Sequence, residues 1–540
     1  MKYFFILFNV LIFISAQNWS QESSKIITII QSGSLEKNEV IYPDANILLK
    51  KNNIRVHLFH EGADIRSDKS IFYSKNNFFN AEGNVVFNQG DTLILTSDYF
   101  EYDGIKKKAI AKGNVLLKMP DMTLETDTLF LDRIKNIAFY KTPGKIIDNS
   151  NILISNEGTY YIDKKKYNFN KNVKINNPEY VLTSTSLDYF TITKESFFYG
   201  PSKIIGKDYD IYCERGYYDS NKQTGNFKQN AIIYYNQRII EGDSLYFENE
   251  KKYASASNKI IITDTINNSI IKGNFGEIFK NKDSAIITKK ALAINIIDND
   301  SLYIHADTLI ATGPADKRFL RGYYNVRILK TDIKGKSDSL YLNESTGKME
   351  LLMKPFSKKD LQVLSSEKKT AKNPVLWFEK SQMSGEIIHL ITDLESKKLD
   401  SLYIFGNSFI IEKDSLSENG YNQIKGINLL GDFEKGNLKN ILVDKNTEVI
   451  YYMYSDEGEL VGINKTICSS IKMDFNNNEI EKISFYISPD GKLKPEKLVD
   501  ENLRELDGFI WRINEKPNTI NDLFVPMESS LSNAYPNPFN

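Results

Sequence analysis

The chain has 540 residues, of which 69 are Lys or Arg and 70 are Asp or Glu. These charges nearly cancel, which argues against a nucleic-acid partner because nucleic-acid-binding proteins present a basic surface. Tyr and Phe supply 31 residues each, while Pro and Gly are too sparse for a disordered chain. The composition is typical of a β-rich protein.

The first 16 residues have the features of a secretory signal peptide. Met1-Lys2 gives a short cationic start, residues 3–14 are apolar apart from one Asn, and Ser15-Ala16 supplies a small-residue cleavage site. The apolar run is too short to span a bilayer as a helix. We therefore expect cleavage near Ala16 and export of residues 17–540.

The chain contains two cysteines, Cys213 and Cys468, which lie 255 residues apart. A disulfide framework in an exported protein uses many closely spaced cysteines, so the sequence favours two separate thiols in strands. A bridge between two modules is the alternative.

A seven-residue phrase recurs from residue 81 onward. Residues 81–87 read Ala-Glu-Gly-Asn-Val-Val-Phe, and residues 111–117 read Ala-Lys-Gly-Asn-Val-Leu-Leu. Weaker copies of the Asn-Val step follow at 145–146, 172–173, 203–204, 230–231 and 259–260. A period near 30 residues, held over seven copies, is typical of stacked repeats. Apolar residues alternate within each copy, which predicts a β-strand with one apolar face.

A second phrase, Asp-Thr/Ser-Leu followed by alternating apolar residues, lies between these copies. It begins at Asp91, Asp127, Asp243, Asp300 and Asp338. Short polar side chains of this kind suit turns, and the Leu and aromatic residues after them suit a pleated surface. Each repeat is therefore predicted as strand, turn, strand, turn. The predicted fold over residues 17–352 is an all-β, elongated β-jelly roll or β-solenoid of stacked hairpin repeats.

The pattern changes after residue 352. Residues 353–374 are Lys-rich and flanked by prolines, which indicates a linker. Residues 375–515 are predicted to form a second β module whose hairpin turns lie at 395–398, 434–437 and 476–479. Within it, residues 506–513 are expected to dock as a last apolar segment. Residues 516–540 are expected to form a loose tail.

Candidate metal-binding and catalytic residues are few. His57 and His60 are separated by an odd offset that places them on opposite faces of a strand, so a metal site is disfavoured. Asp474, Asn476 and Asn478 resemble the start of a calcium loop, but the Gly and the distal Glu of such a loop are missing, and a hairpin turn is favoured. No phosphate-binding loop, nucleophile elbow or acid pair stands apart from the turns. We expect neither enzymatic activity nor a cofactor.

The alternating apolar residues allow two interpretations. They fill a packed core, as protein interiors require. Alternatively, the two sheets are splayed and enclose a long apolar trough. Periodicity alone does not decide between these interpretations.

The Ala-x-Gly-Asn-Val phrase alternates with Gly-Asp-Thr-Leu-x-Leu-Thr-Ser-Asp-Tyr at residues 90–99, behind a signal peptide, and this combination resembles the OstA-like (organic solvent tolerance) family. The likeness is best over residues 55–135 and looser up to residue 350. The family includes the periplasmic lipopolysaccharide-transport protein and the N-terminal domain of the outer-membrane lipopolysaccharide translocon. The long Tyr- and Asn-rich chain is similar to versions found in Bacteroidetes-type bacteria. Within this family, the sequence favours the soluble bridge.

The resemblance implies a jelly roll whose interior shields the acyl chains of lipopolysaccharide (lipid A) in the periplasm during transport to the outer membrane. It also implies end-to-end strand addition with transport components at the inner and outer membranes, and self-association through the same edges. We expect a periplasmic location, with association to the outer membrane left open. The residues assigned to the lipid-facing surface are Val85, Phe87, Leu93, Leu95, Val115, Leu117, Leu129, Leu131, Val173 and Ile175.

Two other classes of protein stay open. One is a structural or adhesive secreted β-solenoid that acts through its outer surface. The other is a carbohydrate-active β-helix enzyme, which is disfavoured because no carboxylate cluster stands out from the turns.

Overall fold

The computed structural model describes residues 26–525, except 91–92, 121, 149–150, 236, 297–299, 315–316, 354–371, 477–478 and 501–503. The predicted signal peptide and most of the predicted linker lie outside these residues. The described residues form antiparallel β-strands and a few short 3-10 helices, which confirms the all-β prediction. Among them, no helix is both long and apolar enough to cross a membrane.

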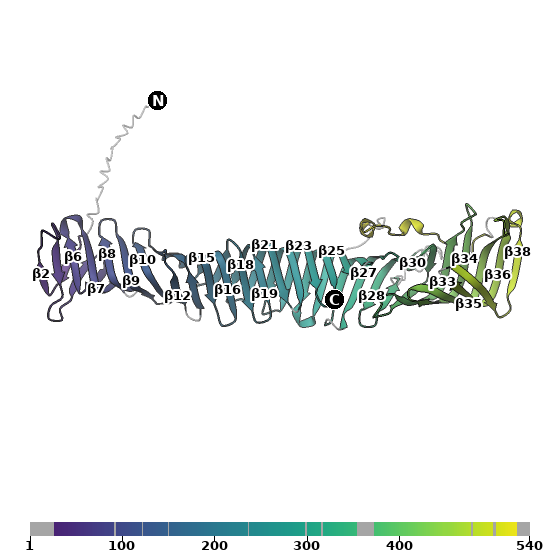
Figure 1. The fold of residues 1–540 in the computed structure, drawn as a ribbon, viewed down its shortest axis with the longest axis horizontal. Helices are drawn as coiled ribbons and strands as arrows, with labels where there is room; N and C mark the ends of the chain where they lie inside the picture. Colours follow the sequence, from purple (N-terminus) through teal and green to yellow (C-terminus); the bar gives the residue numbers. More distant parts are fainter. Residues whose placement is uncertain are drawn as a thin grey trace, which may run out of the picture. The chain divides into compact units, whose positions relative to one another are not determined.

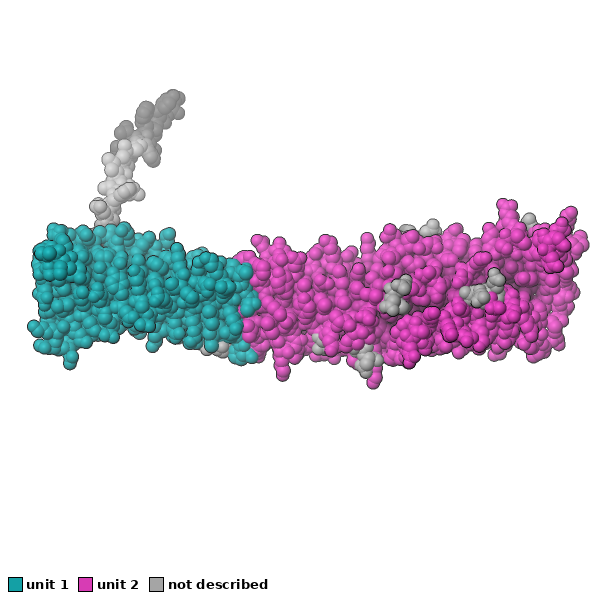
Figure 2. Space-filling model, viewed as in Figure 1, with its two compact units in different colours: residues 1–178, 183–192 teal, residues 179–182, 193–540 magenta. Residues whose placement is uncertain are grey.

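The chain forms two compact units, coloured teal and magenta in Figure 2. Unit 1 comprises residues 1–178 and 183–192, and unit 2 comprises residues 179–182 and 193–540. The division falls within strand β16 (Tyr180–Phe190).

The other strands of unit 1 are β1 (Thr28–Gln31), β2 (Ser34–Glu36), β3 (Asn46–Leu49), β4 (Val56–His60), β5 (Ala63–Ser67), β6 (Lys69–Tyr73), β7 (Phe78–Gln89), β8 (Leu93–Asp103), β9 (Lys108–Met119), β10 (Met122–Asp132), β11 (Ile137–Tyr140), β12 (Gly144–Asp148), β13 (Asn151–Ser155), β14 (Glu157–Tyr161) and β15 (Lys166–Asn176). Those of unit 2 are β17 (Glu195–Phe198), β18 (Ser202–Gly206), β19 (Asp210–Cys213), β20 (Arg215–Asp219), β21 (Thr224–Tyr235), β22 (Arg238–Glu248), β23 (Tyr253–Asp264), β24 (Ser269–Phe279), β25 (Ser284–Asn295), β26 (Leu302–Thr312), β27 (Phe319–Leu329), β28 (Ile333–Asn343), β29 (Lys348–Leu352), β30 (Val375–Phe378), β31 (Ser381–Ser384), β32 (Ile387–Thr392), β33 (Leu399–Lys413), β34 (Tyr421–Glu434), β35 (Asn437–Tyr454), β36 (Leu460–Asn476), β37 (Glu479–Tyr486) and β38 (Asp490–Lys494). The short 3-10 helices are η1 (Ser74–Asn76), η2 (Lys280–Lys282), η4 (Glu496–Leu498), η6 (Ile513–Glu515) and η7 (Asn521–Phe524).

Successive strands pair antiparallel as hairpins within each unit (Figure 1). In unit 1, β7 pairs with β8 from Phe78↔Asp103 to Gln89↔Leu93, and β8 pairs in turn with β9. Strands β7 and β9 begin 30 residues apart, at Phe78 and Lys108. One hairpin of two long strands therefore accounts for the period of the sequence, which confirms the prediction of stacked hairpin repeats.

A two-residue bulge interrupts every second long strand near its middle. In β7 it is Gly83-Asn84, with φ angles of 76° and 46°, and in β9 it is Gly113-Asn114, with φ angles of 73° and 46°. Gly enters this left-handed region without strain and Asn tolerates it better than most residues, which explains why Gly-Asn recurs at this place. Bulges bend a strand, so neighbouring bulges together form a crease that divides the sheet of each unit into two wings.

Acidic residues bind the Asn of the bulge from β8 or from the junction between two short neighbouring strands. Nδ2 of Asn84 donates to Oδ2 of Asp68 at 2.7 Å, and Nδ2 of Asn114 donates to Oδ2 of Asp98 at 2.8 Å. In unit 2 the same bond, at 2.8 Å in both cases, joins Asn230 to Glu214 and Asn407 to Glu386. These bonds help to fix the position of the bulge in these four strands.

The prediction that the Asp-Thr/Ser-Leu phrase forms turns is wrong for three of its copies. Asp127, Asp243 and Asp338 lie in the middle of β10, β22 and β28, next to the crease. The copy at Asp300 directly precedes β26, and Asp91 lies outside the described residues. A bulge needs the same short polar side chains as a turn, so composition alone does not separate the two.

The strands that flank the predicted linker belong to one antiparallel sheet in unit 2. Strand β28 pairs with β30, and β29 pairs with β32. The hairpin turns predicted at 434–437 and 476–479 are confirmed, because Phe433 pairs with Leu438 and Phe475 pairs with Ile480.

We call residues 504–525 the C-terminal arm. Leu506 packs in an apolar cluster with Ile450 and Tyr452, and the rings of Phe509 and Trp511 lie beside Tyr421. This confirms the predicted docking of residues 506–513.

The arm continues into residues that were predicted to be part of the loose tail. Leu523 is fully buried, and Oδ2 of Asp522 accepts hydrogen bonds from the N–H groups of Asn518 and Thr519. Because a carboxylate, and not apolar periodicity, organises this turn, the sequence pattern does not reveal it.

Candidate functional site

We define the wings by their position relative to the bulge. In the odd-numbered strands that carry a bulge (β7, β9, β15, β21, β23, β25, β27, β33 and β35), residues before the bulge belong to the first wing and residues after it to the second. The strands between them are antiparallel, so their first halves belong to the second wing and their last halves to the first wing. The inward faces of the two wings face each other and enclose the interior. The other side of the sheet is its outer, solvent-facing side.

The ten predicted lipid-facing residues all lie on the inward faces of unit 1. None is more than 7% exposed. In β9, Val115 and Leu117 are buried whereas Leu116 between them points outward. The alternation therefore predicts the inward face correctly, and contact of these residues with lipid stays a prediction.

The two wings of unit 1 differ in chemistry. The second wing is mainly aliphatic, with Leu58, Ile65, Val85, Leu95, Val115, Leu117, Leu124, Ile146, Leu153, Val173 and Ile175. The first wing combines aromatic rings with small residues, namely Phe79, Phe100, Tyr102, Tyr140, Tyr160, Tyr167 and Phe169 with Ala81, Ala109, Ala111 and Ala138. Small residues leave room for neighbouring rings to stack, as in Tyr160 and Tyr167, whose centroids are 4.4 Å apart.

Polar contacts join the rims of the two wings in unit 1. Nδ1 of His60 in the second wing lies 2.8 Å from the hydroxyl of Tyr102 in the first, and Arg133 donates to the same hydroxyl at 2.8 Å. Beside them, Lys107 pairs with Glu61 at 2.9 Å, and this hydrogen bond holds the pKa of Glu61 below its ordinary value.

A second set of rim contacts lies farther along unit 1. The hydroxyl of Tyr189 donates to Oδ2 of Asp148 at 2.9 Å and accepts a hydrogen bond from Nδ2 of Asn151 at 3.1 Å. The hydroxyl of Tyr167 lies 3.0 Å from the sulfur of Met122. With the buried side chains behind them, these contacts close the unit 1 interior, so the packed interpretation describes this state of unit 1.

In unit 2 the wings separate around a cavity of about 390 Å³, which we call the mouth. Its walls carry Ile328 and Ile333 from the second wing and Leu342, Met349 and Leu390 from the first. Turns at the two rims add the polar groups of Asn267, Asn268, Asn295, Lys330, Glu344 and Lys397. The volume lies in the range of small-molecule and cofactor sites, and the mouth combines apolar walls with a strongly polar rim.

A smaller cavity of about 40 Å³ adjoins the mouth and shares Asn295, Leu342 and Glu344 with it. Two ion pairs join the wings beside it, Arg238 with Asp283 at 2.8 Å and Arg318 with Asp264 at 2.9 Å. They close the interior on this side of the mouth. Burial raises the pKa of Glu344 above its ordinary value.

The residues of the mouth have no distinguishing pattern in the sequence. Met349 and Leu390 follow the same alternation as residues in the closed part of the sheet, so their pattern carries no sign of a cavity. The residues that line the mouth come from strands and turns that are far apart in the sequence.

The histidines singled out in the sequence lie apart. Nε2 of His57 is 2.6 Å from Oδ1 of Asp64, whereas His60 is buried on the opposite face, as predicted. Within the described part of the chain, no group of three or more His, Cys, Asp or Glu side chains could hold a metal ion.

The described residues that resemble a calcium loop and the two cysteines lie within strands or at a strand end. Asp474 and Asn476 end β36, and Asn476 pairs with Glu479, which confirms the hairpin turn; Asn478 lies outside the described residues. Cys213 and Cys468 are buried free thiols, which confirms the prediction of two separate thiols.

This geometry defines a class of protein: an antiparallel sheet of stacked hairpins, creased at the middle of its strands so that two wings enclose an apolar interior. Residues 24–185 match the model of the OstA-like protein family, which confirms the resemblance for this part of the chain. Among solved structures 17 chains match. One is the crystal structure of LptH from Pseudomonas aeruginosa, the LptA-homologous periplasmic component of the conserved lipopolysaccharide transport device, with 14% identity, a TM-score of 0.19, and coverage of 19% of this chain and 79% of that chain. No curated protein is significantly similar to this chain.

Proposed function

We propose that this protein is a periplasmic carrier that shields the acyl chains of lipopolysaccharide during transport to the outer membrane. The OstA-like region at residues 24–185 supports this proposal, together with the role named for LptH. The observation that carries it is the mouth of unit 2, because it opens the apolar interior between the wings.

The energetics of lipid burial are consistent with this function. Removing one methylene from water is worth about 0.8 kcal/mol, so an acyl chain of some twelve methylenes gains roughly 10 kcal/mol. Each rim hydrogen bond contributes about 1 kcal/mol. In unit 1, entry of an acyl chain requires the wings to part at contacts such as Tyr102 with His60 and Tyr189 with Asp148. The ten predicted residues are the surface that the chain would then contact.

The ends of the units suit strand addition. The last strands, β37 and β38, both pair with β36 and leave Ile480, Phe485 and Leu493 exposed. In unit 1 the first strands, β1 and β2, leave Ile30 and Leu35 exposed. Edges of this kind accept another strand. We therefore propose end-to-end assembly with transport components at the inner and outer membranes, or with a second copy of this chain.

Lipid analysis combined with photo-crosslinking tests the proposed function. Protein purified without added lipid should carry lipid A, identified by mass spectrometry of the extract. Photo-crosslinkers at Val115 or Leu129, which face inward, should capture lipid A, and crosslinkers at Leu116 or Phe130, which face outward, should not. Capture from the outward positions alone would instead support a structural or adhesive protein that acts through its outer surface.

A further inference from the structure

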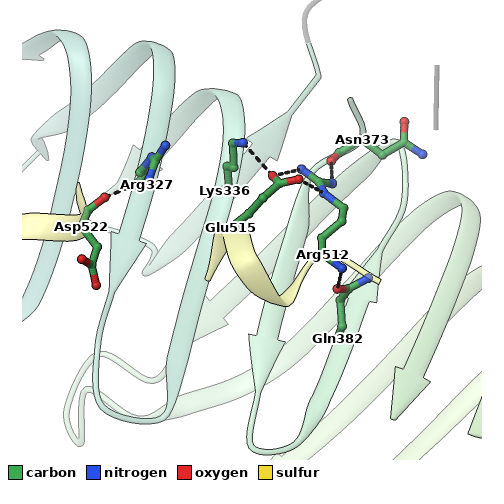
Figure 3. A network of polar contacts seen from close by, with 7 residues as sticks. All are labelled: Arg327, Lys336, Asn373, Gln382, Arg512, Glu515 and Asp522. Carbon is green, nitrogen blue, oxygen red and sulfur yellow. Dashed lines mark hydrogen bonds and ion pairs between the residues drawn. The ribbon is translucent and has the colours of Figure 1, made fainter. Parts of the chain in front are cut away.

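The C-terminal arm crosses the outer face of the second wing of unit 2 (Figure 3). A guanidinium N–H of Arg327 in β27 donates to the main-chain carbonyl of Asp522 at 2.8 Å, and Nζ of Lys336 in β28 pairs with Glu515 at 2.6 Å. Arg512 of the arm binds the same Glu515 at 2.8 Å. The arm is thus attached to two adjacent strands by charged groups.

Two buried glutamines hold the arm where it crosses β31 and β34. Oε1 of Gln382 accepts the N–H of Arg512 at 2.7 Å, while its Nε2 donates to the carbonyl of Ile510 at 2.8 Å. Gln423 binds Leu506 and Arg504 in the same manner, with both bonds at 2.8 Å. Both amides are buried beneath the arm, and each uses its oxygen and its nitrogen on main-chain groups of the arm. The arm therefore has a defined register on the sheet.

The arm lies directly behind one wall of the mouth. Adjacent residues in a strand point to opposite faces, so Arg327 faces the arm whereas Ile328 faces the mouth. In β28, Lys336 faces the arm and Ile333, at an odd offset from it, lines the mouth. In β26 the ring of His305 packs against Phe524 of the arm, with centroids 4.9 Å apart.

We infer that the arm holds the second wing away from the first and so sets the width of the mouth, with Arg327 and Lys336 as positioning residues for the bound ligand. The wall of an empty apolar cavity gains contacts by moving inward, so a mouth that stays open needs support from outside. The arm supplies this support across β26, β27, β28 and β31. The identification of the ligand as an acyl chain rests on the proposed function.

The width of the mouth can be measured directly in the full chain. Spin labels are placed at Ile296 and Leu394, two exposed residues on opposite rims, in a Cys213→Ser, Cys468→Ser background. Arg327→Ala and Lys336→Ala should shorten the distance between the labels. They should also weaken binding of the apolar probe N-phenyl-1-naphthylamine about tenfold.

Three further variants keep the test specific. Lys425→Ala removes a 2.8 Å bond to the arm at the carbonyl of Asp507, over β34, and should leave the mouth unchanged. The conservative change Lys336→Arg should restore the wild-type distance. If an alanine variant does not fold, Glu515→Gln is used in its place, because it removes the charge that pairs with Lys336 and keeps the size of the side chain.

The two proposals fail in different ways. An unchanged label distance and unchanged probe affinity in the Arg327 and Lys336 variants would overturn the inference about the arm. If the distance shortens as expected but the wild-type protein binds neither the probe nor lipid A, the inference about the arm stands and the proposed function is wrong.

Discussion

The ring of Phe87 in the second wing of unit 1 packs against the ring of Phe100 in the first wing, with centroids 5.4 Å apart. Both rings are buried. The two wings therefore meet through their own side chains, and an acyl chain can enter this interior only by separating such pairs.

Removing one of these rings should favour lipid binding at the expense of stability. Phe87→Ala should lower the free energy of unfolding by about 3–5 kcal/mol, because it leaves a cavity in a packed interior. Lipid A should then raise the melting temperature of the variant more than that of the wild type, since the ligand fills the cavity. Phe130→Ala, on the outer face, is the control. It should show neither the large loss of unfolding free energy nor the additional rise in melting temperature with lipid A. An equal response in all three proteins would contradict a lipid site between the wings.

The crease should depend on the backbone conformation of its Asn residues. Asn114→Ala places alanine at a φ of 46° and removes the bond to Asp98, so it should cost about 1–3 kcal/mol of unfolding free energy. Asn114→Gly loses the bond but keeps the conformation, and should cost less. Urea denaturation measures both, with the exposed Lys118→Ala in the same strand as control. A larger loss for Gly than for Ala would refute this account of the repeat.

Stability should depend on pH through Glu344 at the mouth. Burial raises the pKa of this carboxyl, and the nearby Arg318 offsets the effect only in part. A raised pKa in the folded state means that the contribution to stability is complete below the unfolded-state pKa and is lost as pH rises through the folded-state pKa. Glu344→Gln should therefore melt at a higher temperature than wild type near pH 7, and the difference should shrink toward about pH 4. The exposed Glu418→Gln should show no such trend.

The cysteines should be unreactive in the folded protein. Burial raises the pKa of Cys213 to about 12 and also raises the pKa of Cys468. Iodoacetamide near pH 8 should label neither thiol until denaturant is added, because the thiolate is the reactive form. Cys468→Ser should be tolerated, since Sγ of Cys468 contacts the carbonyl of Ser470 as Oγ of Ser97 contacts that of Tyr99. Rapid labelling of the native protein would show that these strands are not packed as described.

The sequence predicts the inward faces residue by residue because a strand has a period of two. Val115, Leu116 and Leu117 illustrate this, with the middle residue turned outward. It does not separate a turn from a bulge at Asp127, because both use short polar side chains next to a bend in the backbone.

Features that depend on distant parts of the chain were beyond such a prediction. The alternation that places Leu390 on the inward face is the same in closed and open parts of the sheet, so it does not reveal the mouth. The position of the arm depends on Gln382 and Gln423, whose partners lie more than 80 residues away in the sequence.

Crosslinking from the mouth is the most direct test of lipid carriage. A photo-crosslinker at Leu390, which lines the mouth, is compared with one at the adjacent outward residue Ile391 in the intact protein incubated with lipopolysaccharide. We expect saturable crosslinking from Leu390 that unlabelled lipid A competes away, and none from Ile391. Equal crosslinking from both positions, or none from Leu390, would contradict the proposal that acyl chains enter the interior between the wings.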